Sequence, residues 1–187
     1  MLATRVISTP LGRMTAAATE RGLCALEFEG QRTDRAMRAL SSLGEAGDDC
    51  VPGPASMTLD AVEREMAAYF AGELKKFTLP LDLDPCGTAS AFEMRVWLAL
   101  RKIPFGQTRS YGDLAMELGR PGASRAVGMA NGRNRIAIVT PCHRVIGSDG
   151  RLTGYAGGLE RKRRLLEIEG SWRPNPSLFE SVYGIGV

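Results

Sequence analysis

The residues best suited to chemistry lie together in the run Pro141-Cys142-His143-Arg144. His143 is the only histidine in the chain. A histidine and an arginine beside a cysteine favour a lowered thiol pKa, and the thiolate is the nucleophilic form of that side chain. The run therefore predicts a reactive thiol, although Cys142 as a buried, inert residue and His143 as a packing residue are ordinary alternatives.

The residues before this run are expected to deliver it to the end of a strand. Ile136–Thr140 is an apolar, β-prone stretch, which predicts a strand. Pro141 holds the preceding residue in extended geometry and cannot donate to a strand ladder, so the strand must end in a turn there. Cys142 is therefore expected near a strand end, where reactive groups tend to lie.

Charge is distributed unevenly along the chain, whose formal net charge is only +3. Residues 1–85 contain 9 Lys and Arg against 13 Asp and Glu, a net charge of −4, whereas residues 86–187 contain 15 against 8, a net charge of +7. A basic second half suits the binding of a polyanion such as nucleic acid. A solvated basic surface gives the same count.

The first half predicts an antiparallel meander. Three short β-prone runs are separated by the turn sequences PLG and ERG. These runs are Thr4–Thr9, Met14–Thr19 and Leu23–Glu29. A small N-terminal sheet follows from them.

The remainder of the first half is expected to be helical, with one more strand. Helices are expected near Thr33–Leu43 and Ser56–Gly72, joined by a polar loop over Gly44–Pro54 that is rich in Gly and Pro. Lys76–Asp84 alternates well enough to predict a strand. Pro85-Cys86-Gly87 then breaks the pattern, so we place a domain boundary there and expect an N-terminal α/β domain over residues 1–85.

The second half is expected to be mainly helical. Ser90 and Glu93 have the spacing of a capping box at a helix start, and Ser110 can cap a short helix that runs through Leu118. After the turn sequence GRPG, the stretch Ala123–Ala130 makes another helix. Two short helices joined by a tight turn suggest a helix-turn-helix, although many all-helical domains contain such a pair.

The second helix of this pair has almost no side-chain bulk, since it contains Ala123, Ala126, Gly128 and Ala130. Such a helix can approach a partner's backbone closely. That property suits a narrow minor groove better than the side-chain readout typical of the major groove. Close packing against another helix is the alternative.

Taken together, these motifs resemble those of the O6-alkylguanine-DNA alkyltransferases, also called methylated-DNA–protein-cysteine methyltransferases. The resemblance rests on the strings VWLALRKIPFGQTRSYGDLA, SRAVGMANGRN and PCHRVIGSDGRLTGYAGGLERKRRLLEIEG, which cover roughly residues 88–170 in order. The first half is similar more loosely, through the PLG turn and the segment AYFAGE. The family implies an α+β fold, with a small, ribonuclease-H-like antiparallel sheet domain followed by a mainly helical domain that contains a helix-turn-helix. DNA binding and alkyl transfer are then expected in residues 86–170, and residues 171–187 form a C-terminal tail.

The resemblance implies a Cys-His-Glu arrangement at the nucleophile. Cys142 matches the alkyl acceptor, His143 its base acting through a water, and Glu169 the carboxylate that orients and stabilises the imidazole. Tyr111 matches the tyrosine that protonates the leaving guanine at a ring nitrogen. Asn134 matches the asparagine that ties together the turn around the nucleophile.

Other matches concern the DNA and the base. Arg125 matches the arginine finger that fills the gap left in the duplex when the damaged nucleotide is flipped out, and Tyr111 also lies on the DNA side. Ala126 and Gly128 would face the minor groove, and Ser148 matches a position that touches DNA. The residues expected to line the base pocket are Tyr155 and Val145.

Two features depart from the family. Many members have Asn-Pro where this chain has Asn134-Arg135, so the turn is expected to be less rigid. Some vertebrate members hold a zinc ion with cysteines and histidines, but the sole histidine here is His143, and Cys24, Cys50 and Cys86 alone cannot assemble that site. We therefore expect no metal and no cofactor. Free thiols are expected because no C-x-x-C pair occurs.

The family implies DNA repair by stoichiometric, irreversible transfer of an alkyl group from O6 of guanine, and also from O4 of thymine, in double-stranded DNA onto Cys142. The product is a thioether, which has no good leaving group, so each molecule acts once. No apolar run is long enough to cross a bilayer and the N-terminus lacks a signal-peptide core, so we expect a cytoplasmic protein with no membrane partner. In solution we expect a monomer that could assemble cooperatively on DNA.

Two functions of other classes remain open. A thiol hydrolase also uses Cys, His and a carboxylate, but it regenerates its thiol and turns over many times. A non-catalytic lesion-sensing module has the same DNA-binding surface, but relatives of that kind lack the cysteine that stands here as Cys142. Stoichiometry separates the hydrolase from the transferase.

Overall fold

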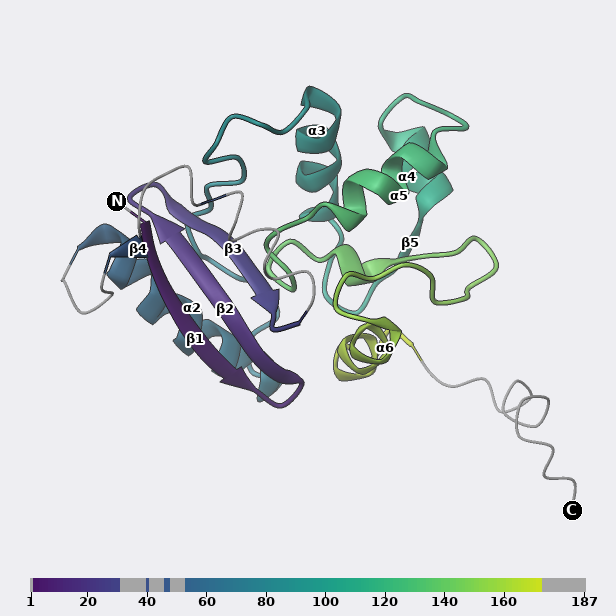
Figure 1. Ribbon diagram of the computed structural model, residues 1–187. Helices are drawn as coiled ribbons and strands as arrows, with labels where there is room; N and C mark the ends of the chain where they lie inside the picture. Colours follow the sequence, from purple (N-terminus) through teal and green to yellow (C-terminus); the bar gives the residue numbers. More distant parts are fainter. Residues whose placement is uncertain (1, 31–39, 41–45, 48–52, 173–187) are drawn as a thin grey trace, which may run out of the picture.

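The computed structural model describes residues 2–30, 40, 46–47 and 53–172 (Figure 1). Its first half is a sheet covered by one long helix. Strands β1 (Leu2–Thr9), β2 (Gly12–Thr19) and β3 (Gly22–Phe28) form the predicted antiparallel meander, which is confirmed. The short β4 (Ala46–Gly47) pairs in parallel with β1, giving the order β3-β2-β1-β4. Helix α2 (Pro54–Phe70), which confirms the predicted second helix, contacts all three long strands.

Gly22 explains how a segment from later in the chain reaches the sheet. Its φ is +140°, and a Cβ on this residue would lie 2.4 Å from the carbonyl oxygen of Pro80, so only glycine fits. The close approach lets the Leu23 N–H donate to the Pro80 carbonyl at 2.9 Å and the Asp82 N–H donate to the Leu23 carbonyl at 2.9 Å. The segment around Leu81 therefore lies along the outer edge of β3.

The strand predicted over Lys76–Asp84 is nevertheless wrong. The segment makes one isolated parallel bridge, between Leu23 and Leu81, and no regular strand. Its apolar residues serve packing instead, since Leu79 is buried and Phe77 lies against the same core. Alternation of apolar and polar residues indicates which side chains are buried. Burial does not by itself give the backbone a neighbouring strand to pair with.

Three helices form a second apolar cluster on the other side of the molecule (Figure 1). Helices α3 (Ala91–Leu100) and α4 (Tyr111–Glu117) both pack on α5 (Ser124–Gly132), and a tight turn over residues 118–123 joins α4 to α5. Ser90 Oγ accepts from the Glu93 N–H at 3.2 Å while the Glu93 carboxylate accepts from the Ser90 N–H at 2.8 Å. Ser110 and Asp113 repeat this capping box at α4. The predicted starts of α3 and α4 are therefore confirmed.

The end of the chain connects these two parts. A 3-10 helix, η2 (Cys142–Arg144), leads into β6 (Val145–Ile146), which pairs in parallel with β5 (Arg109–Ser110). Helix α6 (Leu159–Ile168) follows, and in Figure 1 it lies beside the sheet and below the helical cluster. The core beneath the sheet includes Ile136, Ile138 and Leu165, so it is built from both halves of the sequence.

The strand predicted over Ile136–Thr140 is also wrong. Ile136 makes one parallel bridge to Leu26, and the chain then turns, with Ile138 at a φ of +70° that β-branched residues rarely adopt. The stretch is apolar because Ile136 and Ile138 are buried against β3, not because it forms a ladder. Cys142 accordingly begins a 3-10 helix after a buried turn and does not follow a strand.

Some expectations concern residues outside the described part of the chain. Of the helix expected near Thr33–Leu43 only Leu40 is described, and most of the tail over residues 171–187 is outside. Within the loop expected over Gly44–Pro54, Ala46–Gly47 form β4 instead. The domain boundary after residue 85 stays a prediction. Among the described helices, none is both long and apolar enough to span a bilayer.

Candidate functional site

Asn134 organises the turn that presents Cys142. Its side-chain Nδ2 donates to the Cys142 sulfur at 3.1 Å and to the Thr140 carbonyl at 2.8 Å, and its Oδ1 accepts from the Ile136 N–H at 3.1 Å. These bonds satisfy buried backbone groups that a strand partner would otherwise satisfy. The Asn134 amide thus joins the two ends of the turn over residues 134–142, alongside backbone hydrogen bonds such as that from the Thr140 N–H to the Ile136 carbonyl at 3.0 Å. Cys142 is only 4% exposed.

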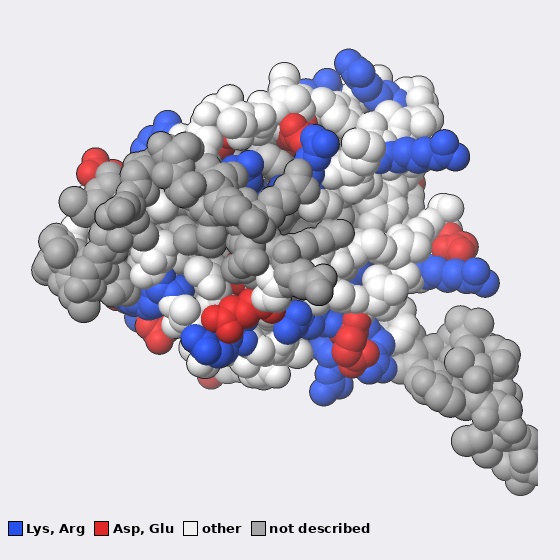
Figure 2. Space-filling view, in the orientation of Figure 1, with Lys and Arg blue, Asp and Glu red and all other residues white. Residues whose placement is uncertain are grey.

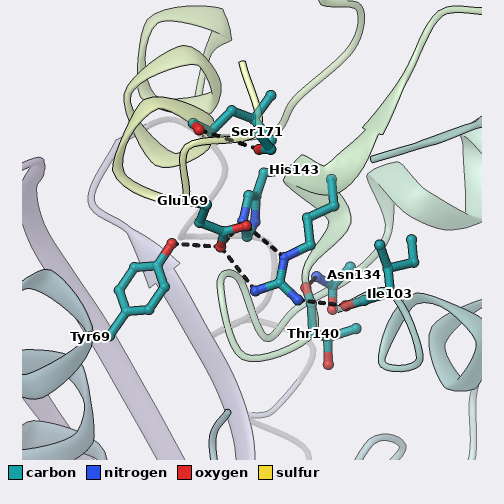
Figure 3. Close-up of polar contacts among 9 residues, drawn as sticks. Tyr69, Ile103, Asn134, Thr140, His143, Glu169 and Ser171 are labelled. Carbon is teal, nitrogen blue, oxygen red and sulfur yellow. Dashed lines mark hydrogen bonds and ion pairs between the residues drawn. The ribbon is translucent and has the colours of Figure 1, made fainter. Parts of the chain in front are cut away.

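A second network of hydrogen bonds surrounds the carboxylate of Glu169 (Figure 3). Glu169 caps the C-terminus of α6 and its side chain is fully buried. Arg144 donates to it twice, through Nε at 2.8 Å and Nη2 at 2.9 Å, and Tyr69 donates its hydroxyl at 2.8 Å. The remaining contact is with His143 Nε2, at 2.9 Å. The predicted pair of His143 and Glu169 is therefore brought together, joined by two residues that sequence reasoning did not assign to it.

Burial and this network together set the protonation state of His143. Burial alone would raise the pKa of Glu169, but hydrogen bonds from His143 and Arg144 outweigh it and lower that pKa to about 2. Burial lowers the pKa of His143 by more than the hydrogen bond and charge of Glu169 raise it, and the Arg144 charge adds to the lowering, so the imidazole is neutral at neutral pH. With its N–H at Nε2 directed to Glu169, Nδ1 carries the lone pair, and Nδ1 is buried with no partner among the described residues. His143 thus has the form of a base.

The expectation that Cys142 has a lowered thiol pKa is wrong for this conformation. Burial raises the pKa of Cys142, whereas the hydrogen bond from Asn134 and the charge of Lys162 act in the opposite direction and are smaller. Arg144, two residues further along the chain, does not lower the thiol pKa, because its guanidinium is hydrogen-bonded to Glu169 and to the Ile103 carbonyl. The thiol needs a base to remove its proton.

Lys162 is a site residue that the sequence analysis missed. Its side chain is buried, and its ammonium donates to the carbonyls of Val145 at 2.5 Å and Thr153 at 2.6 Å. Burial lowers the pKa of Lys162 to about 8, although the nearby Cys142 opposes this change. The only signal was its place in the basic run ERKRR, where nothing in the sequence distinguishes the one fully buried cation from the three arginines beside it.

Pairing between β5 and β6 brings Tyr111 to the same region. Ser110 pairs with Ile146, so the first residue of α4 lies near the chain that follows the nucleophile. The Tyr111 hydroxyl donates weakly to the carbonyls of Thr153 and Gly154, both at 3.4 Å. Burial raises its pKa, so the phenol stays protonated and can serve as a proton donor.

A small cavity lies beside Cys142. Its volume is about 30 Å³. Its lining residues come from four segments: Glu27, Phe28, Asn134, Ala137, Cys142, Tyr155, Ala156 and Gly157. Tyr155 was expected here, whereas Val145 does not line this cavity, because it is fully buried in the helical cluster. The cavity is large enough for a water and too small for a purine, so a base could enter it only if its walls moved.

The residues expected to meet DNA lie at the surface of the helical part, with one exception. Arg125 and Ala126 are exposed on α5, and Ser148 is exposed in the turn after β6. Gly128 is partly buried, because its Cα faces the Tyr111 ring, where a Cβ would lie 3.7 Å away. Met129 is 62% exposed, so this helix does present one bulky side chain that the sequence analysis overlooked.

Metal-binding residues do not gather in the described part of the chain, which holds no group of three or more His, Cys, Asp or Glu able to bind an ion. Cys24, Cys86 and Cys142 are free thiols.

Comparison with known proteins places both halves in one family. Residues 91–171 match the DNA-binding domain of the 6-O-methylguanine DNA methyltransferases, and residues 2–83 match their ribonuclease-like domain. The methylated-DNA–protein-cysteine methyltransferase of Mycolicibacterium paratuberculosis is 45% identical over 90% of this chain and 93% of its own. That of Methanosarcina acetivorans is 45% identical over 89% of this chain and 97% of its own.

Solved structures agree. A crystal structure of Mycobacterium tuberculosis OGT in complex with DNA has a TM-score of 0.75 and 44% identity, covering 90% of this chain and 93% of that one. The chain therefore belongs to the 6-O-methylguanine DNA methyltransferase family, with the α+β fold of its two domains. It is an enzyme of the methylated-DNA–protein-cysteine methyltransferase class.

Proposed function

We propose that this protein repairs alkylated duplex DNA by moving the alkyl group from O6 of guanine, or O4 of thymine, onto the sulfur of Cys142. The observation that carries the proposal is the position of Cys142, which borders a cavity and is followed in the chain by a candidate base. Cys142 lines a cavity, and the next residue is a neutral imidazole fixed by a buried carboxylate.

The transfer needs Cys142 as a thiolate, and His143 is the base that removes the thiol proton. Its Nδ1 takes the thiol proton of Cys142 through a water, and Glu169 stabilises the imidazolium that forms. The sulfur then attacks the alkyl carbon, a sulfur–carbon bond forms, and the carbon–O6 bond breaks. Its electron pair leaves with the base, which takes a proton from Tyr111 at a ring nitrogen. Support for this last step is the protonated phenol near the nucleophile.

The thioether product explains a single use of each molecule. A thioether carbon has no good leaving group, so water cannot regenerate the thiol as it does from an acyl-enzyme. The protein is then both catalyst and co-substrate. A thiol hydrolase with the same residues would release many products per chain, which is the alternative that the experiment below excludes.

A base stacked in a duplex cannot reach the sulfur of a residue as buried as Cys142, which is 4% exposed, so the proposal includes base flipping. We assign DNA contact to the pair α4 and α5, acting as a helix-turn-helix in the minor groove. The exposed Arg125 would occupy the space left by the extruded nucleotide, Ala126 would allow close approach, and Ser148 would contact the backbone. Figure 2 shows Lys and Arg side chains projecting from the helical side of the molecule, which suits a polyanion.

The test is intact-mass measurement after incubation with a duplex containing O6-methylguanine. The expected result is one added methyl group per chain even in substrate excess, mapped to Cys142 by peptide analysis. Cys142→Ser should abolish transfer and retain DNA binding, whereas the control Cys86→Ser, at another free thiol, should react normally. Methylation at Cys24, Cys50 or Cys86 in the unaltered protein would refute the proposal, as would more methyl groups transferred than chains present.

A further inference from the structure

One wall of the cavity beside Cys142 comes from the first half of the chain. Glu27 and Phe28, at the end of β3, line it together with Ala137 and residues 155–157. Phe28 is 7% exposed and belongs to the core beneath the sheet. The N-terminal sheet therefore borders the space that a group must occupy in order to reach Cys142.

Arg161 holds this wall from α6. Its guanidinium carbon lies 4.5 Å from the centre of the Phe28 ring. Its Nε donates to the Leu11 carbonyl at 2.9 Å, in the turn between β1 and β2, and its Nη1 donates to the Gly157 carbonyl at 3.1 Å. One planar side chain thus connects the first hairpin, the aromatic ring and the loop that lines the cavity. This use of a rigid fork over an aromatic face suits arginine and not lysine.

The neighbouring arginines of α6 behave differently. Arg163 and Arg164 pair with Glu160 and Glu167 of the same helix at the surface. Arg161 instead reaches a residue 150 positions away. The contrast indicates that its contacts serve the cavity wall and not the helix.

Phe28 and the loop over residues 155–157 pack directly against each other, with no free space between them. A Cβ on Gly157 would lie 3.1 Å from Phe28 Cδ2 and 2.7 Å from Tyr155 Cε1, so these residues pack at contact distance. A substituent on O6 points at the sulfur, so it meets the walls next to Cys142 whichever way the base enters. A large substituent then requires the Phe28 ring to move. Arg161 opposes this movement, because the ring is stacked on a guanidinium that hydrogen bonds to Leu11 and Gly157 hold in place.

We propose that Phe28 and Arg161 determine the largest alkyl group that Cys142 can accept. This inference rests on the proposed alkyl transfer. Phe28 is the specificity-determining residue, because its ring occupies the space that a benzyl group would need. Arg161 is a positioning residue that keeps the ring in place. The N-terminal sheet is thereby part of the substrate site, and methyl is the favoured substituent.

The test compares two duplexes that differ only in carrying O6-methylguanine or O6-benzylguanine, with full-length protein under single-turnover conditions. The quantity measured is the ratio of the benzyl to the methyl transfer rate at Cys142. Phe28→Ala should raise this ratio about tenfold or more, since apolar pockets discriminate by about 10- to 200-fold per methylene-sized change. Phe28→Leu, which preserves more packing, and Arg161→Gln should raise it by smaller factors. Arg164→Gln is the matched control and should leave the ratio unchanged.

The outcomes separate this inference from the function on which it rests. If the unaltered protein alkylates Cys142 but no Phe28 variant changes the ratio, the inference is overturned and the transfer stands. Equal slowing with both duplexes by Phe28→Leu, at an unchanged melting temperature, also overturns it, because the residue would then support catalytic geometry alone. If the unaltered protein alkylates Cys142 from neither duplex, the proposed function itself fails.

Discussion

Replacing Glu169 by Gln should destabilise the fold and slow the transfer together, because one buried carboxylate serves both. Glu169→Gln keeps the side chain's shape but removes its charge. The guanidinium of Arg144, whose side chain is 7% exposed, then has no counter-ion. Removing one partner of a buried pair in this way costs about 3–5 kcal/mol of folding stability.

The pKa of Glu169 gives an independent magnitude. Burial raises it, but the hydrogen bonds from His143 and Arg144 prevail and lower it from 4.5 to about 2. A change of this size corresponds to roughly 3 kcal/mol of folding stability. Because the pKa is lower in the folded state, this contribution is present above pH 4.5 and is lost as the pH falls toward 2.

Urea unfolding at neutral and acidic pH measures both effects. At neutral pH, Glu169→Gln should lower the free energy of unfolding by about 3–5 kcal/mol. Because Gln does not titrate, the variant should also lose less stability between neutral and acidic pH than the unaltered protein does. The matched control is Glu167→Gln on the same helix, whose partners Arg163 and Arg164 lie at the surface. This control should lose less than about 1 kcal/mol.

The same variant reports on chemistry. Gln at position 169 cannot stabilise the imidazolium of His143, and by analogy with other orienting carboxylates the rate of Cys142 methylation should fall by up to about 10⁴-fold. If Glu169→Gln has the same free energy of unfolding as Glu167→Gln, and its stability falls with acid as that of the unaltered protein does, the buried network does not stabilise the fold as argued. If its methylation rate is unchanged, His143 acts without the carboxylate.

Two further predictions concern DNA. Arg125→Ala should slow repair of duplex DNA by about tenfold or more relative to its effect on the reaction with free O6-benzylguanine, because only the duplex has stacking to replace; equal losses, measured by Cys142 alkylation, would assign the residue to folding or to the pocket. Binding of unmodified duplexes should be blind to sequence and weaken steeply with salt, with a log-log slope of roughly −5 if about six phosphates are contacted. A slope near zero in a titration from low to physiological salt, or a strong preference for one sequence, would contradict the assigned interface.

Local elements of the fold could be predicted because their causes lie within a few residues. Ser90 and Glu93 cap α3 through bonds three positions apart, and Ser110 caps α4 in the same way. The two strands predicted over Lys76–Asp84 and Ile136–Thr140 were wrong for one reason. Both segments are apolar because they fill the core, and whether a buried segment also finds a strand partner depends on chain far away.

The sequence by itself identified the family, and through that resemblance it indicated the residues that we propose as nucleophile, base and carboxylate, namely Cys142, His143 and Glu169. It could not determine the state of the thiol. The cations adjacent in sequence predict a lowered pKa, but the folded chain buries Cys142, turns Arg144 toward Glu169 and places Lys162 near the sulfur instead.

Tertiary structure alone also decided which distant residues complete the site. Tyr69 joins Glu169 across 100 positions, and Arg161 joins the first hairpin to the cavity loop across 150. Sequence spacing fixes contacts only where the backbone itself repeats, within a helical turn or between neighbouring strands. Desolvation and long-range hydrogen bonds depend on how whole elements pack, so the electrostatics of Cys142 and the walls around it exist only in the folded chain.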